Sequence, residues 1–271
     1  MMNEILRDLS EPALINAIEE NLFAFHPYFL GWSRSGGQTS PKLLWNITDI
    51  PFPLFNYAFN ARFMPEDADR EIEVVIARGR SRKVPLLWFI GPSTTPADLG
   101  QYLIAHGFVH DGDSPGMAAD LHKLQDDRAE VPHLTITPVK DIESLKIWCD
   151  ILVAGYGMPE SVGPAFLDWF SSFRLDPQMP LRHYIGWWNG KPSAIASMLL
   201  AAGTAGVYNI TTLPEARGKG IGSAMTLTPL LEARAEGVRV GVLQSTAQGF
   251  PVYRKLGFQE YCSIGSYVLD A

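Results

Sequence analysis

The stretch VYNITTLPEARGKGIGS, residues 207–223, decides how the rest of the chain is interpreted. It begins with β-branched and aromatic residues, which favour a strand, and Pro214 then breaks that pattern. A glycine-rich turn follows and opens into a helical pattern over 225–235. The first backbone N–H groups of a helix have no partner within it and lie at the positive end of its dipole. The stretch therefore predicts an anion site.

The turn suits a phosphate or pyrophosphate. Gly218, Gly220 and Gly222 let a ligand approach the backbone closely. Arg217 and Lys219 add positive charge. Residues 217–222 alone also fit a glycine-rich helix start that binds no ligand. The rest of the sequence has to distinguish these two possibilities.

Two familiar phosphate motifs do not fit this turn. A Walker loop has four residues between a glycine and Gly-Lys-Ser/Thr, and residues 218–223 do not supply that spacing. A Rossmann fingerprint has a third glycine where Ser223 stands. It also has an acidic residue after the next strand, which here ends in Gln244 and Ser245.

The pattern that fits is Arg or Gln, two residues, Gly, one residue, then Gly or Ala. It resembles the coenzyme A pyrophosphate loop of the GNAT superfamily of N-acetyltransferases. The resemblance covers about 134–269. It implies that the backbone of the strand end pairs with the pantetheine amides and that the turn holds the pyrophosphate. The implied cofactor-binding residues are Thr212, Leu213, Arg217, Gly218, Lys219, Gly220, Ile221, Gly222 and Ser223.

A second motif, STAQGFPVYRKLGF at 245–258, resembles the helix that precedes a Gly-Phe pair in the same family. In that family the tyrosine of this helix commonly protonates the departing thiolate of coenzyme A, and Tyr253 matches its position. A phenol with a pKa of about 10 can protonate a thiolate whose thiol has a pKa of about 8.5 when both are desolvated. The alternative is that Tyr253 is an amphipathic core residue.

A general base is harder to assign. Many GNAT enzymes use a glutamate on the fourth strand, which we take to be residues 193–200, and this stretch has no carboxylate. Asn209 or Ser197 could hold a water, and we expect Asn209 to act as a catalytic residue together with Tyr253. Glu160, Asp168 and His183 are further candidates, although a lone histidine at a strand start is more often structural. An acceptor amine that is already neutral needs no base to deprotonate it before it attacks.

The composition is that of a folded globular protein. The 271 residues are 46% apolar and 19% charged, which is enough for one large domain or two ordinary ones. The net charge of −7 makes nucleic acid a poor partner. No apolar run is long enough for a membrane span, and the first residues do not resemble a signal peptide. The two cysteines, Cys149 and Cys262, are treated as buried thiols and point to the cytoplasm, without a metal site.

Apolar periodicity and turn residues predict the order of elements. Helices are expected at 11–25, 65–81, 98–106, 141–153, 166–170, 221–235 and before 256. Strands are expected at 43–47, 54–59, 86–90, 117–121, 134–137, 182–188, 193–200, 206–212, 238–243 and 267–269. Aromatic residues between 156 and 170 could line an acceptor pocket, although such a stripe is more often core.

The two halves share one pattern about 150 residues apart. Met64-Pro65-Glu66 matches Leu213-Pro214-Glu215, which places Asn60 opposite Asn209. His106-Gly107-Phe108 matches Leu256-Gly257-Phe258. Asp69 and Glu71 stand where the phosphate turn has Gly218 and Gly220, so the first copy is not expected to bind coenzyme A.

We therefore expect an α/β (α+β) chain of two GNAT-like domains, each a mixed, mostly antiparallel twisted sheet flanked by helices. A degenerate domain at 1–124 and a linker at 125–133 precede the catalytic domain at 134–271. The predicted function is direct acetyl transfer from acetyl-CoA to the amine of a small molecule, for example an amino-sugar conjugate, by a monomer or homodimer. The alternatives are a non-catalytic acyl-CoA sensor and a transferase of aminoacyl or longer acyl groups.

Overall fold

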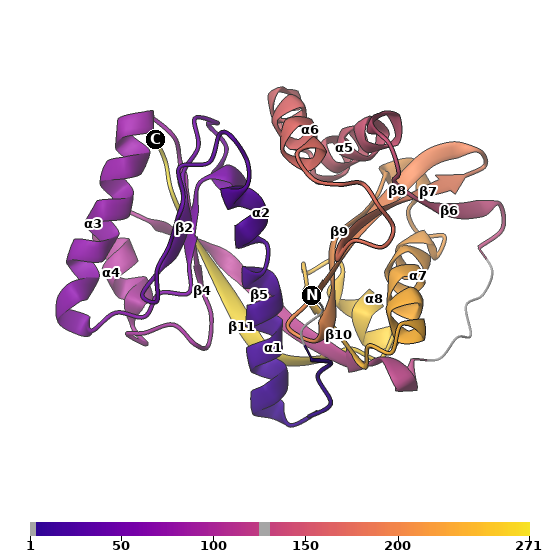
Figure 1. Ribbon diagram of the computed structural model, residues 1–271, viewed down its shortest axis with the longest axis horizontal. Coiled ribbons are helices and arrows are strands. Elements are labelled where there is room, and N and C mark those ends of the chain that lie inside the picture. The colour runs from indigo at the N-terminus through magenta and orange to yellow at the C-terminus, as the bar shows by residue number, and fades with distance from the viewer. Residues whose placement is uncertain (1–3, 125–130) are drawn as a thin grey trace. The chain divides into compact units, whose positions relative to one another are not determined.

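The computed structural model describes residues 4–124 and 131–271 (Figure 1). Its helices are α1 (Glu11–Phe23), α2 (His26–Leu30), α3 (Pro65–Arg82), α4 (Leu99–Ala105), α5 (Ile142–Tyr156), α6 (Gly163–Ser171), α7 (Ile221–Ala235) and α8 (Phe250–Lys255). Its strands are β1 (Gln38–Thr39), β2 (Leu44–Asn46), β3 (Tyr57–Phe59), β4 (Leu86–Ile90), β5 (Val109–Asp120), β6 (Leu134–Pro138), β7 (Leu181–Trp188), β8 (Lys191–Ala201), β9 (Thr204–Thr212), β10 (Val240–Gln244) and β11 (Gln259–Leu269).

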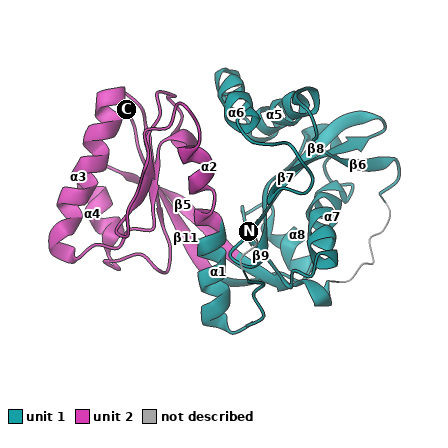
Figure 2. Cartoon of the chain, in the orientation of Figure 1, with its two compact units in different colours: residues 1–21, 117–261 teal, residues 22–116, 262–271 magenta. Residues whose placement is uncertain are grey.

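The chain forms two compact units (Figure 2). Unit 1 contains residues 1–21 and 117–261, and unit 2 contains residues 22–116 and 262–271. Strands β5 and β11 each contribute residues to both units. The boundaries of these units differ from those of the domains expected from the sequence, 1–124 and 134–271. The expected domains follow the two sequence repeats and remain a prediction. Of the expected linker, residues 125–130 lie outside the described part of the chain.

The sheet of unit 1 has the strand order β5-β10-β9-β8-β7-β6. The pairs β6–β7, β7–β8 and β8–β9 are antiparallel, whereas β9 and β10 are parallel. The expected mixed, mostly antiparallel α/β architecture is confirmed. Both α7 and α5 contact β8 and β9, and residues 193–200 of β8 are all buried. Helices therefore cover the sheet on both faces, as the continuous burial of residues 193–200 requires.

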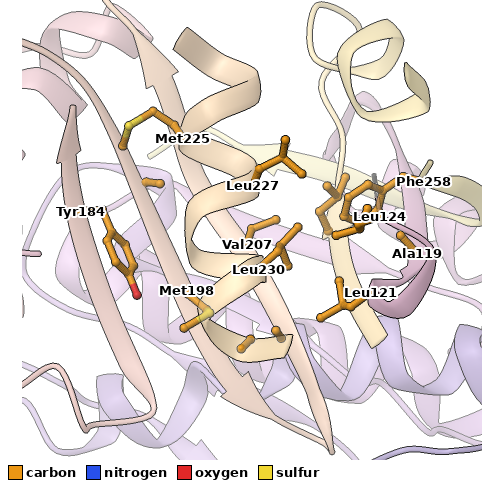
Figure 3. Packing of buried hydrophobic residues seen from close by; sticks show 14 of the residues in the cluster. Ala119, Leu121, Leu124, Tyr184, Met198, Val207, Met225, Leu227, Leu230 and Phe258 are labelled. Atoms are coloured by element: carbon orange, nitrogen blue, oxygen red, sulfur yellow. The ribbon is translucent and has the colours of Figure 1, made fainter. Parts of the chain in front are cut away.

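The core of unit 1 draws on residues that lie far apart in the sequence. Met225 and Leu230 of α7 belong to one buried cluster with Phe258, which follows α8 (Figure 3). Leu121 and Leu124 belong to the same cluster and are 0% and 5% exposed, although they precede β6. Full burial of a side chain of this size contributes about 1.5–3 kcal/mol. Unit 1 therefore depends on chain that the sequence repeat assigns to the other half.

Unit 2 has the strand order β1-β2-β3-β4-β11 and repeats local features of unit 1. Asn60 and Asn209 have positive φ angles of 55° and 52°. The Gly-Phe pairs also correspond: the Phe108 N–H donates to Leu103 O at 3.0 Å, and the Phe258 N–H donates to Tyr253 O at 3.1 Å. These shared backbone conformations support the internal repeat. In this correspondence the buried Leu103 of unit 2 lies where unit 1 has Tyr253.

Within the described residues, no helix combines the length and apolarity needed to cross a membrane. The same residues hold no cluster of three or more His, Cys, Asp or Glu side chains suited to a metal ion.

Candidate functional site

A cleft of about 560 Å³ opens in unit 1 beside β9. The backbone of β9 pairs with β10 at Ala205 and Gly206, and the cleft lining begins at Val207. The other walls come from residues 216–218 and 220–223, the end of α5 and the start of α8. A strand that leaves its parallel neighbour exposes backbone N–H and C=O groups to an extended ligand.

A β-bulge at Asn209 accompanies this separation. The register of β8 with β9 shifts between Ile195 and Ser197, which pair with Thr211 and Tyr208. Asn209 lies in the extra segment of β9, has a φ of 52° and lines the cleft. Bulges bend a strand and redirect its side chains, and they are frequent beside active sites. The sequence places Asn209 correctly on this strand, but its left-handed conformation comes from the structure.

The predicted phosphate turn leads from β9 into α7. Gly218 and Gly220 have φ angles of 74° and 81°, which glycine adopts without a Cβ clash. The N–H of Ala224 donates to Gly220 O at 3.1 Å, the first α-helical bond of α7. The preceding N–H groups, up to that of Ser223, therefore have no acceptor within the helix. They form the positive end of its dipole at the wall of the cleft.

Six residues of this turn that are predicted to bind the cofactor line the cleft: Arg217, Gly218, Gly220, Ile221, Gly222 and Ser223. Thr212 lines the cleft as well. Its carbonyl accepts a hydrogen bond from Arg217 Nε at 2.9 Å, and Arg217 Nη2 donates to Gly155 O at 3.4 Å. The guanidinium thus bridges the end of β9 and the end of α5.

Two predicted binding residues lie outside the cleft lining. The N–H of Leu213 donates to Ser193 O at 2.9 Å, and its carbonyl accepts from the Ala216 N–H at 2.9 Å. Both backbone groups of Leu213 are therefore already engaged within the protein. The ammonium group of Lys219 lies 5.1 Å from the centroid of the Trp188 ring, a cation–π contact.

Tyr253 lines the cleft from α8, close to Tyr156 from the end of α5. Its ring packs edge to face on Phe258, with the centroids 6.0 Å apart. Desolvation, with a smaller contribution from Tyr156, raises the pKa of Tyr253 above the ordinary value of 10. The phenol is therefore protonated at neutral pH and can donate a proton.

A polar chain runs from the core to Asn209. Asn209 Nδ2 donates to Ser197 Oγ at 3.2 Å, and Ser197 Oγ lies 2.8 Å from His183 Nδ1. Trp148 and Phe170 pack against the imidazole, each with a centroid distance of 4.8 Å. Burial lowers the pKa of His183 to about 3, so the ring is neutral at physiological pH.

The structure also adds a contact that the sequence did not indicate. Asn21 of α1 accepts a hydrogen bond from the hydroxyl of Tyr208 at 2.7 Å. The amide of Asn21 donates to Ala201 O and to Thr204 Oγ1, both at 3.0 Å. Tyr208 lines the cleft, so α1 supports one of its walls. The only sequence signal for this role is an asparagine inside the expected helix at 11–25.

The other sequence candidates lie away from the cleft. Phe166, Trp169 and Phe170 are core residues, whereas Tyr156 is the one member of the aromatic segment that lines the cleft. Glu160 and Asp168 are not among its lining residues. Residues 193–200, which the sequence predicts as the fourth strand, lie in β8. Counted from β6, β8 is the third strand of unit 1 and β9 is the fourth. Like β8, β9 has no carboxylate.

The cysteines differ from each other. Cys149 is 2% exposed, and burial raises the pKa of its thiol to about 12. Cys262 is only partly buried, so the expectation of two buried thiols is wrong for this residue. Its position on β11, near where the two units divide that strand, was not evident from sequence.

In unit 2 the corresponding opening between β3 and β4 is closed by the chain itself. The N–H of Thr95 donates to Ala61 O, and the N–H of Phe63 donates to Thr95 O, both at 3.0 Å. Asp67, in the first turn of α3, pairs with Lys42 at 3.3 Å and with Arg70 at 2.8 Å. The first turn of α3 therefore carries an acidic side chain that is paired with protein cations.

Comparisons with known proteins agree with this geometry. Residues 181–260 match the model of the acetyltransferase (GNAT) domain family. A search of curated proteins gives no match.

Solved structures share the fold over nearly the whole chain. A GCN5-related N-acetyltransferase from Kribbella flavida has a TM-score of 0.72 at 16% identity, over 97% of this chain and 96% of that one. Another from Sphaerobacter thermophilus has a TM-score of 0.61 at 15% identity, over 99% and 96%. A tandem GNAT protein from the clavulanic acid biosynthesis pathway has a TM-score of 0.57 at 13% identity, over 98% and 97%.

Proposed function

Because residues 181–260 form a GNAT domain, which supports acyl transfer, we propose that the protein is an N-acetyltransferase. It moves an acetyl group from acetyl-CoA directly to the amine of a small molecule. The observation that carries this proposal is a single cleft in unit 1 that holds both the helix-start phosphate turn and Tyr253. One feature provides an anion site and the other a proton donor.

The donor would bind with its pyrophosphate at the turn. The N–H groups at the start of α7 and the open approach at Gly218 and Gly220 favour a doubly charged phosphate bridge. Pantetheine would lie along β9, where Thr212 supplies backbone groups in the cleft wall. The side chain of Arg217, which now donates to Thr212 O, would have to share or release that carbonyl.

The transfer step needs no covalent enzyme intermediate. The lone pair of the amine attacks the thioester carbon, and the carbonyl oxygen gains negative charge. Backbone N–H groups of β9 would stabilise that oxyanion. The C–S bond then breaks as Tyr253 gives its proton to the sulfur. The nitrogen loses one proton to water, and the Tyr253 phenolate recovers a proton from water, so the products are the amide and the free thiol of coenzyme A. Asn209, with its side chain at the cleft, would accept a hydrogen bond from the attacking nitrogen.

Two alternatives share this cleft. A non-catalytic acyl-CoA sensor is favoured by the absence of a carboxylate from β8 and β9. A transferase of aminoacyl or longer acyl groups would use the same turn and the same tyrosine. Cytoplasmic location and a monomeric or homodimeric state remain predictions from the sequence.

The proposal is tested by incubating the protein with acetyl-CoA and a panel of small amines while following release of free thiol. We expect amine-dependent thiol release and a matching acetylated product. Gly218→Ala should weaken acetyl-CoA binding by about tenfold, or about 1.4 kcal/mol, because a Cβ at this position obstructs the close approach of the pyrophosphate to the backbone. Binding of acetyl-CoA without thiol release across the panel would instead support the sensor.

The chain provides a matched control for this variant. Gly190, in the turn between β7 and β8, has a φ of 73° against 74° for Gly218, and an added Cβ meets no atom within 4 Å at either position. Gly190→Ala should therefore lose similar stability but retain acetyl-CoA affinity. Equal affinity losses in both variants would remove the turn from the donor site.

A further inference from the structure

We propose that Ser197 and His183 are positioning residues for the transfer reaction, which they influence through Asn209 and without touching either substrate. This inference rests on the proposed function. The three side chains come from β8, β7 and β9 and form one hydrogen-bonded chain that ends at the cleft. Asn209 is its only member in the cleft lining.

The two inner residues are buried. Ser197 is 0% exposed and His183 is 4% exposed. They pair directly across the β7–β8 ladder, so their side chains lie on the same face of the sheet. A buried polar pair costs stability unless each partner is hydrogen-bonded. Ser197 meets this requirement by contacting both His183 Nδ1 and Asn209 Nδ2.

The direction of the bonds determines what Asn209 presents to the cleft. Its amide nitrogen donates to Ser197 Oγ at 3.2 Å. The other end of the amide, Oδ1, can only accept hydrogen bonds. With the nitrogen held by Ser197, this carbonyl oxygen remains for the N–H of an attacking amine. An amide rotated by 180° would present a donor instead and would repel that N–H.

The backbone at Asn209 explains why such a restraint is needed. A non-glycine residue with a φ of 52° at a bulge has no ladder neighbour to fix its side chain. Strained backbone of this kind occurs at functional sites, where surrounding contacts over-determine it. The bond to Ser197 supplies one such contact from the rigid centre of the sheet.

His183 completes the chain as a neutral group. Its ring is enclosed by Trp148 and Phe170, an environment that disfavours the charged imidazolium. A neutral imidazole can accept a hydrogen bond at Nδ1 from the Ser197 hydroxyl, which leaves the lone pairs of that oxygen for Asn209. His183 therefore sets the orientation of Ser197, and Ser197 sets that of Asn209.

A double-mutant cycle tests this chain in the full-length protein. Ser197→Ala should lower kcat by about tenfold while leaving the acetyl-CoA KM unchanged, since a lost orienting hydrogen bond is a modest free-energy term. Asn209→Ala should give at least the same loss. The double variant should lose no more than Asn209→Ala alone, because Ser197 acts only through that side chain. The inference would be overturned by a double variant whose loss in kcat is the product of the two single losses, or by full activity of Ser197→Ala.

Two further measurements separate the positioning role from a loss of folding and from the proposed reaction. His183→Phe preserves the aromatic packing and should reduce kcat by about threefold, with a thermal midpoint close to that of the wild type. In NMR spectra the Asn209 side-chain NH₂ should show slowed exchange that Ser197→Ala abolishes. Unchanged exchange contradicts the positioning role even if no amine is acetylated. A wild type without turnover on any amine contradicts only the proposed function.

Discussion

Replacement of Tyr253 by phenylalanine is expected to lower kcat by about 10²- to 10³-fold while leaving acetyl-CoA affinity nearly unchanged. Tyr253 is the proposed proton donor, and desolvation raises the pKa of its phenol, so it remains protonated at neutral pH. Phenylalanine keeps the packing on Phe258 but cannot protonate the departing sulfur. The measurement is the rate of thiol release at saturating acetyl-CoA and amine, together with the dissociation constant of acetyl-CoA.

Two other tyrosines serve as comparisons. Tyr261 on β11 lies outside the cleft lining, so Tyr261→Phe should retain the wild-type rate. Tyr156 is the other phenol near Tyr253, and Tyr156→Phe tests whether it can be the donor instead. A large loss in Tyr156→Phe with a normal rate in Tyr253→Phe would reassign the acid to α5.

The fragment 134–271, which the sequence repeat marks as the catalytic domain, is expected not to fold by itself. It lacks Met117, Leu121 and Leu124, which belong to the buried cluster of unit 1. Loss of three such side chains removes about 5–9 kcal/mol of burial, as much as the whole stability of many domains. It also lacks Asn21 of α1, whose amide holds the β8–β9 turn through Ala201 and Thr204.

Urea unfolding followed by far-UV circular dichroism tests this prediction. The full chain should unfold cooperatively, whereas the fragment should show no cooperative transition and no acetyl-CoA binding. Mixing it with a second fragment, residues 1–124, should restore both properties, because that piece carries α1 and β5. A fragment that alone unfolds at the midpoint of the full chain and binds acetyl-CoA would contradict the account.

Local patterns in the sequence were sufficient for most elements and for the position of the cleft. The turn at 217–223 is recognisable because glycine spacing and a following helix pattern are local properties. Tyr253 is recognisable because it precedes Gly257 and Phe258, whose conformations recur at Gly107 and Phe108. In the structure the turn and Tyr253 line one cleft, and their roles remain predictions.

Features set by distant pairing were not predictable in this way. The polar stretch 109–116 has no apolar alternation, yet it extends the expected strand at 117–121 into the twelve residues of β5. β11 pairs with β4, although the repeat assigns these strands to different halves. Periodicity states which face of a strand is buried but not which neighbour it joins. The same limit hides the support of Tyr208 by Asn21, which lies 187 residues away in the sequence.

The most direct measurement of the central claim is a crystal structure of the protein with acetyl-CoA. The account predicts pyrophosphate oxygens within hydrogen-bonding distance of the N–H groups at Gly220–Ser223, pantetheine along β9, and the thioester sulfur next to the Tyr253 hydroxyl. Pyrophosphate bound anywhere else, for example at the start of α3, or a sulfur atom beyond reach of Tyr253, would contradict it.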